Sequence, residues 1–152
     1  MISRRAFLLI LGSGPAFAQL PPNITAERQA ALRAAIRKAT SGAAVRAGKV
    51  TISIPPLIDN GNTVPISVTV DSPMTEADHV KAIHLFTEKN PQPYVLTAHL
   101  GPRAGRARVD TRARIADTGQ VIAIAQLSDG SYWSDTVSVV VTLSACLEDG
   151  LI

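Results

Sequence analysis

From residue 49 onward, apolar and polar side chains alternate along the chain. This period of two is typical of strands that bury one face. The clearest run is 64–70, where Val and Ile alternate with Pro, Ser and Thr. Stretches rich in Gly, Pro, Asn and Asp interrupt the pattern. It predicts seven strands, over residues 50–54, 64–70, 80–86, 94–100, 105–115, 120–127 and 132–143.

Seven short strands separated by regular turn signals predict an all-β fold of the immunoglobulin-like β-sandwich type. The first two strands flank the stretch 59–62, Asp-Asn-Gly-Asn, whose residues tolerate positive φ, so we expect a hairpin there. The Cys…Trp…Cys spacing of antibody domains is absent, because the chain holds one cysteine.

Residues 25–40, ahead of the strands, predict a short N-terminal helix that is ancillary to the core. Thr25 is the expected N-cap, Glu27 should lie in the first turn, and Gly42 follows the expected end. A narrow apolar stripe should face the domain while the basic residues stay in solvent. The stripe is Ile24, Leu32 and Ile36, and the basic residues are Arg28, Arg33, Arg37 and Lys38.

The first residues have the order of an export signal. A twin-arginine pattern over 3–8 precedes the apolar stretch 8–11, and Ala16 and Ala18 occupy the positions that a signal peptidase reads. The apolar stretch is too short to be a permanent membrane anchor. We expect cleavage after Ala18 and a mature protein in the periplasm of a Gram-negative bacterium.

These patterns divide the chain into four predicted parts. Residues 1–18 are the twin-arginine signal peptide and 19–44 the N-terminal helical segment. Residues 45–143 form the sandwich, and 144–152 a C-terminal cysteine arm.

The charge of the chain is nearly balanced once the signal is removed. The whole chain has 15 Lys and Arg against 12 Asp and Glu. Without Arg4 and Arg5 the counts are 13 and 12. Such a balance gives no reason to expect a nucleic-acid partner.

Cys146 is the one cysteine, so no disulfide can form within the chain. It follows the last predicted strand. Three interpretations remain open from the residues alone. The thiol could carry cargo on a flexible arm, pack inertly if Leu147, Leu151 and Ile152 pin the arm to the body, or form a mixed disulfide with a partner.

Four arginines, Arg106, Arg108, Arg112 and Arg114, alternate with apolar residues and should share one strand face with Asp110. Such a face could dock an acidic partner or an anion. It could equally be an ordinary solvated face.

The remaining candidate groups predict neither a metal site nor a catalytic site. His79, His84 and His99 do not have the spacing of a ligand set. We expect His84 to be hydrogen-bonded and partly buried, on the strand face of Val80, Ala82 and Phe86. A thiol on a mobile arm cannot hold a base in reach, and no phosphate loop or Gly-x-Ser-x-Gly elbow is present. We therefore expect no cofactor and no enzyme.

Several stretches resemble SoxY, the carrier subunit of the periplasmic SoxYZ complex of bacterial thiosulfate oxidation. The resemblance implies an immunoglobulin-like sandwich, a SoxZ-like partner subunit and sulfur intermediates held covalently on the cysteine, which visits client enzymes of sulfur oxidation. The stretches that carry the resemblance are 59–65, 70–75, 81–91, 112–116 and 128–131.

The arm departs from the Gly-Gly-Cys-Gly-Gly ending of true SoxY proteins. Ala145 and Leu147 flank the cysteine, and Glu148 and Asp149 follow. The arm is similar to that of the SoxY-related group with an Ala-Ala-Cys-Ile-Glu type of ending. It has less backbone freedom and more bulk, and its acidic residues disfavour thiolate and repel anions such as thiosulfate.

The sequence therefore predicts a carrier subunit with a covalent attachment point at Cys146, in a heterodimer with a SoxZ-like chain. The alternative is a non-covalent adaptor subunit of such a heterodimer, with no cargo on the cysteine.

Overall fold

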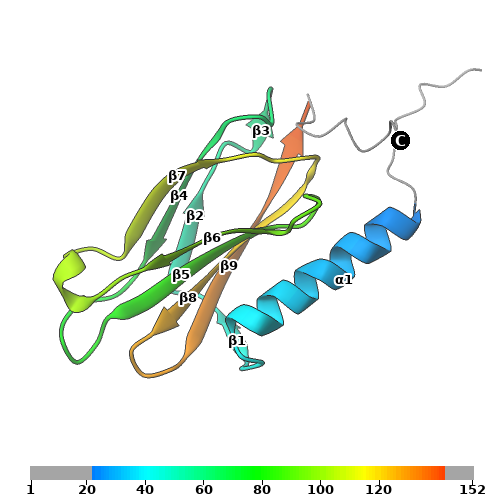
Figure 1. Ribbon diagram of the computed structural model, residues 1–152. Coiled ribbons are helices and arrows are strands. Elements are labelled where there is room, and N and C mark those ends of the chain that lie inside the picture. Colours follow the sequence, from blue (N-terminus) through cyan, green and yellow to red (C-terminus); the bar gives the residue numbers. More distant parts are fainter. Residues whose placement is uncertain (1–21, 143–152) are drawn as a thin grey trace, which may run out of the picture.

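One helix precedes nine strands in the computed structural model, which describes residues 22–142 (Figure 1). A short 3-10 helix, Pro102–Ala104, joins the sixth and seventh strands. The elements are α1 (Pro22–Ala39), β1 (Val45–Ala47), β2 (Val50–Ser53), β3 (Leu57–Ile58), β4 (Val64–Val70), β5 (Val80–Thr87), β6 (Tyr94–His99), β7 (Arg108–Ala113), β8 (Gly119–Leu127) and β9 (Tyr132–Val141).

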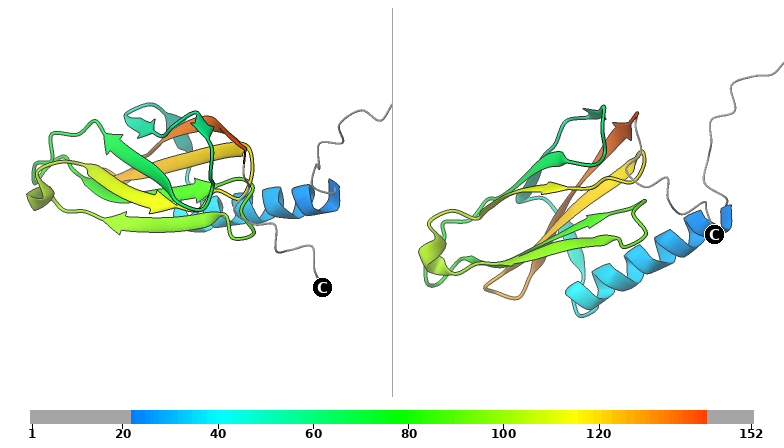
Figure 2. Two further views of the ribbon diagram at one scale, coloured as in Figure 1. Left: turned by 90° about the horizontal axis from the view of Figure 1, so that it is seen from above. Right: turned by 45° about the horizontal axis from the view of Figure 1, so that its top comes forward.

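The strands form two sheets that pack face to face, and this confirms the predicted all-β, immunoglobulin-like β-sandwich (Figures 1 and 2). The smaller sheet has the order β2-β4-β7. The larger sheet has the order β1-β9-β8-β5-β6, with β3 also paired to β9. All seven predicted strands are present. The two that were not predicted, β1 and β3, are short and pair with β9 in parallel.

The core lies between the two sheets, where the period-two pattern directs the apolar side chains. Along β4, buried Val and Ile alternate with exposed or half-exposed residues. From the larger sheet, Ile83, Leu85 and Val121 are also buried in this core. Each such side chain contributes about 1.5–3 kcal/mol on burial. The predicted hairpin is confirmed, because β2 and β4 pair antiparallel, although β3 lies in the connection between them.

Helix α1 covers part of the outer face of the larger sheet, away from the smaller sheet (Figure 2). Leu32 packs in a second cluster with Phe86, Ile124 and Tyr132, and Ile36 lies against it. The predicted stripe is therefore confirmed for Leu32 and Ile36, while the side chain of Ile24 is outside the described part.

The ends of α1 and one of its basic residues test the helix prediction further. The N-cap prediction at Thr25 is wrong, since the helix begins at Pro22; proline suits a first turn because the N–H it lacks would have no helical acceptor. Gly42, at φ 77°, follows the end as predicted, and its N–H donates to the carbonyl of Arg37. Arg28 is buried, not solvated, because its Nη1 donates to the carbonyl of Lys89 at 2.7 Å.

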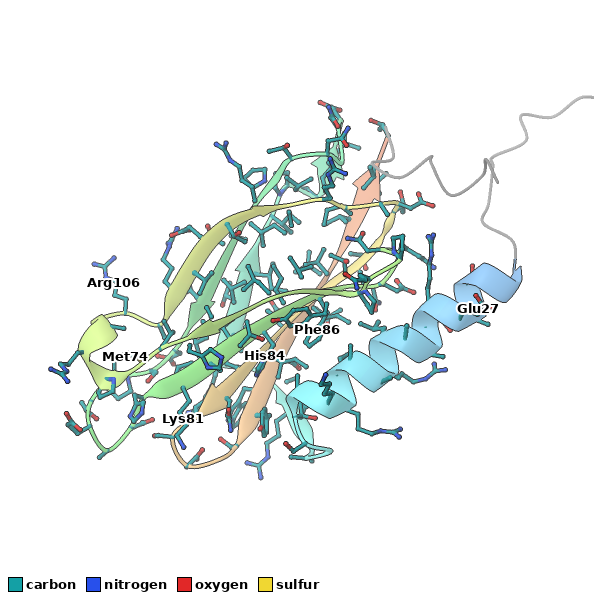
Figure 3. The ribbon with its side chains drawn as sticks, in the orientation of Figure 1. Glu27, Met74, Lys81, His84, Phe86 and Arg106 are labelled. Atoms are coloured by element: carbon teal, nitrogen blue, oxygen red, sulfur yellow. The ribbon has the colours of Figure 1, made fainter. Side chains whose placement is uncertain are left out.

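A bulge in β5 decides which side chains face the helix. The register against β8 shifts between Val80 and Ala82. Val80 consequently lies in the core between the sheets, whereas His84 and Phe86 face outward, toward α1 (Figure 3). The prediction that Val80 shares the face of His84 is wrong for this reason.

Candidate functional site

The base of the C-terminal arm is fixed by hydrogen bonds on both sides of β9. On one side, the N–H groups of Val140 and Thr142 donate to the carbonyls of Pro56 and Ile58, each at 2.9 Å. On the other side, Thr118 Oγ1 accepts the N–H of Val141 at 2.9 Å. Thr142 is therefore a well-defined starting point for the arm.

The predicted attachment site, Cys146, and its neighbours lie outside the described residues. These neighbours are Ala145, Leu147, Glu148 and Asp149. Covalent geometry still limits where the thiol can act. Cys146 is four residues beyond Thr142, so their Cα atoms are at most about 14 Å apart. Any surface that works together with the thiol has to lie at this end of the sandwich or be supplied by a partner.

This end of the sandwich carries an exposed apolar pair. Leu57 and Val140 are register partners, and their exposed fractions are 58% and 51%. Leu57 also lines a hollow of about 180 Å³ together with Pro65 and residues of the β3–β4 connection. The sequence analysis did not identify this pair. The alternation at the end of β9 could have indicated it, because it places exposed Val140 between buried Val139 and Val141.

The four arginines of the predicted docking surface share the exposed face of β7 and its flanks, opposite Ala107, Ala113 and Ile115. The strand is an edge strand of the smaller sheet. The side chains concerned are those of Arg106, Arg108, Arg112 and Arg114. Their role in docking stays a prediction.

Asp110 neutralises one of these arginines. Arg108 Nη2 and Nε each donate to its carboxylate at 2.8 Å, and Ser67 Oγ also contacts it. The hydrogen bonds from Arg108 and then from Ser67 lower the pKa of Asp110 to about 2. The pair is thus ionised throughout the physiological pH range, and the positive charge of this face resides on the other three arginines.

Arg106 lies far from the arm base at Thr142, whereas Arg112 and Arg114 lie close to it. Arg106 follows the 3-10 helix at the opposite end of β7 (Figure 3). Arg112 pairs with Pro65, one of the residues that line the hollow beside Leu57. The loop that continues from Arg114 leads to Thr118, which holds Val141. The arm end therefore combines an apolar pair with two cations.

The histidines lie apart from the arm end. His84 is buried on β5, its partner strand β6 carries exposed His99, and His79 hydrogen-bonds in a loop to Thr75. Across residues 22–142, no three His, Cys, Asp or Glu side chains gather as a metal would require. Within the same residues, no helix has the length and apolar character needed to cross a membrane.

Solved structures with similar folds include the sulfur carrier protein SoxY from Chlorobium limicola f. thiosulfatophilum. The TM-score is 0.64 and the identity 24%, over 77% of this chain and 96% of that chain. Superoxide reductase (neelaredoxin) from Ignicoccus hospitalis gives a TM-score of 0.55 at 17% identity, over 62% of this chain and 80% of that one. The superoxide reductase from Nanoarchaeum equitans gives 0.53 at 14%, over 63% and 100%. At these identities the likeness establishes the fold alone.

Comparison of the sequence with protein families is more specific. No curated protein matches the chain. The family model of sulfur oxidation protein SoxY matches residues 36–146, a range that includes the C-terminal end of α1, all nine strands of the described part and Cys146. By this match, the chain belongs to the SoxY family of sulfur oxidation proteins.

Proposed function

We propose that this protein is a carrier subunit that holds a sulfur-containing intermediate covalently on Cys146 and presents it to enzymes of sulfur-compound oxidation. The observation that carries the proposal is the family match, which extends to residue 146, the cysteine itself. The fixed base at Thr142 supports it, because a short arm on a rigid body delivers a thiol to a defined place.

Loading of the carrier requires a single bond-forming step at Cys146. Joining a sulfur anion such as thiosulfate to Cys146 forms one S–S bond, releases the thiol proton and removes two electrons. We propose that an oxidoreductase client accepts those two electrons. The carrier contributes the sulfur atom and its position, and the chemistry belongs to the clients.

The residues of the arm favour a cargo or clients different from those of a Gly-Gly-Cys-Gly-Gly arm. Leu147 adds bulk next to the sulfur, and Glu148 and Asp149 repel anions. Arg112 and Arg114, at the end where the arm begins, offset part of this negative charge. We propose that clients dock at this end, on the apolar pair and the two arginines.

A SoxZ-like subunit is the proposed stable partner, in the periplasm after twin-arginine export. The smaller sheet offers its outer face for this contact, since α1 already packs on the outer face of the larger sheet. The part of that face on β2 and β4 is polar, with Thr51, Ser67 and Thr69 among its residues, and a partner seated there leaves Arg112 and Arg114 to the clients. It suits a partner with hydrogen-bonding and acidic groups.

The intact mass of the protein, purified from its native host without reductant, tests the proposal. We expect an added mass that corresponds to a sulfur adduct and that dithiothreitol removes. Cys146→Ser should abolish the adduct. In the matched control Cys146→Ser/Ser144→Cys, which keeps a thiol two residues away, we expect an alkylatable thiol without efficient loading.

The alternative role, a non-covalent adaptor, predicts different results. A thiol that stays unmodified while the host oxidises sulfur compounds would contradict carriage. So would a Cys146→Ser strain with unimpaired oxidation. Co-purification of a second sandwich subunit in either case would leave the heterodimer in place and assign the protein to the adaptor role.

A further inference from the structure

A cleft of about 560 Å³ lies between the C-terminal half of α1 and the outer face of β5 and β6. Its walls come from three elements that are distant in sequence. The helix supplies Ala35, Lys38 and Ala39, β5 supplies His84, and β6 supplies Tyr94 and Thr97. Its size suits a small organic molecule, and none of the proposed roles of Cys146 uses it.

His84 gives the cleft an unpaired polar atom. Its side chain is only 7% exposed, and its Nδ1 lies 2.7 Å from Oγ1 of Thr97. Its Nε2 is buried and has no hydrogen-bond partner among the described residues. A buried nitrogen without a hydrogen-bond partner destabilises the fold, so its retention calls for a partner that the described residues do not supply.

The neutral ring of His84 has one donor nitrogen and one acceptor nitrogen, and its hydrogen bond to Thr97 is the basis for assigning them. Burial, and next to it the charge of His99, lower the pKa of the ring, so the ring is neutral at neutral pH. Among the described residues, Nδ1 is the one partner of the Thr97 hydroxyl, and we assign the hydrogen bond between them with the hydroxyl as donor and Nδ1 as acceptor. The tautomer assigned in this way carries its hydrogen on Nε2, the buried nitrogen of this lining residue that has no partner among the described residues.

The other lining groups define the rest of a ligand. Lys38 adds an ammonium group, and none of the six lining residues is acidic. Ala35 and Ala39 lie one helical turn apart and leave room, because their side chains are single methyl groups. The Tyr94 ring is 49% exposed and offers an aromatic wall. The cleft thus pairs two hydrogen-bond donors with an apolar lining.

We propose that this cleft binds a small organic acid, whose anionic head accepts a hydrogen bond from Nε2 of His84 and pairs with Lys38, while its apolar body lies between Tyr94 and the alanines of α1. We assign no role in this binding to Cys146, because the described lining residues belong to α1, β5 and β6. The cleft distinguishes anions from amines by charge, and long apolar acids from short ones by burial.

Three probes with the same eight-carbon body test the head group: octanoate, 1-octanol and octylamine. NMR titration of the mature protein at pH 7.5 should show saturable shifts for octanoate at His84, Thr97 and Ala39. We expect binding of 1-octanol to be at least about ten-fold weaker, and that of octylamine undetectable, because neither head group offers a negative charge to the two donors.

Variants assign the two donors. His84→Phe keeps an aromatic ring and removes Nε2, and should weaken octanoate binding about ten-fold. Lys38→Ala should weaken it about three-fold. Lys81→Ala, an exposed lysine on β5 outside the cleft, is the matched control and should change nothing (Figure 3). If His84→Phe does not fold, Ala39→Leu, which fills the cleft from a helical position, should abolish binding.

Either of two results would overturn the proposal. One is equal binding of octanoate and 1-octanol, or no saturable binding of any probe. The other is octanoate binding that survives both His84→Phe and Ala39→Leu.

Discussion

The side chain of Thr118 forms two hydrogen bonds with the backbone of Val141. Its Oγ1 accepts the N–H of Val141 at 2.9 Å and donates to the carbonyl of Val141 at 3.4 Å. Thr118→Val keeps the shape and removes both contacts. We expect a loss of about 1–2 kcal/mol in the free energy of unfolding, measured by urea denaturation.

Hydrogen exchange locates that effect. The amides of Val141 and Thr142 should exchange faster in Thr118→Val, because the C-terminal end of β9 opens more often. Thr111→Val, a half-buried threonine on β7, is the control. Equal acceleration in both variants, or none at Val141, would mean that Thr118 does not fix the arm base.

The buried Arg28 anchors α1 to the β5–β6 connection through the carbonyl of Lys89. Arg28→Met keeps the apolar stem and removes the guanidinium. We expect the free energy of unfolding to fall by about 2 kcal/mol, since a hydrogen bond from a charged donor is lost. Arg33→Met, at an exposed position of the same helix, should change it by less than about 0.5 kcal/mol. Similar losses in both variants would contradict the anchor.

Burial of His84 makes stability depend on pH in a definite direction. Because the folded pKa lies below the unfolded value of 6.5, the unfolded chain binds more protons between the two values. The part of the free energy of unfolding that depends on a neutral His84 is fully present above pH 6.5. It is lost as the pH falls toward the folded pKa. Urea denaturation at pH 8 and pH 5.5 measures it. His84→Gln should lose less stability over this interval than the wild-type chain; an unchanged difference would refute the burial effect.

Two arginines at the arm end should influence the thiol. Arg112→Glu/Arg114→Glu replaces positive charge by negative, which disfavours the Cys146 thiolate. At pH 7.5 and low salt, we expect iodoacetamide to alkylate Cys146 about two-fold more slowly, and 0.5 M NaCl to remove most of the difference. Arg106→Glu, at the far end of the same face, is the control. An equal effect of Arg106→Glu would contradict the proposal that Arg112 and Arg114 act at the end of the sandwich where the arm begins.

The sequence was sufficient to predict the seven longer strands. Strands such as β2 and β4 bury one face and so show a period of two, whereas β5, buried on both faces, is marked by its apolar content and the turn signals around it. It could not predict β1 and β3. They have three and two residues, and they exist because β9 offers them a parallel edge. Neither spacing nor composition carries a signal for such a distant pairing.

The candidate site shows the same division. Alternation correctly placed the arginines on one face and His84 in a buried position. It missed the bulge that turns Val80 inward, the distant carbonyl that buries Arg28, and the helix that makes a cleft above His84. Each of these depends on which elements become neighbours in three dimensions, and a one-dimensional pattern does not contain that information.

Helix α1 covers the surface around Phe86 and Ile124, so that the sandwich has one covered outer face and one free outer face. A two-layered sandwich with both faces bare could join a partner in two orientations. Here the helix closes one of them to any flat partner surface. A subunit that binds the free face would then meet the arm base at the same end in every complex, so the helix would give the assembly a fixed polarity without touching the cysteine.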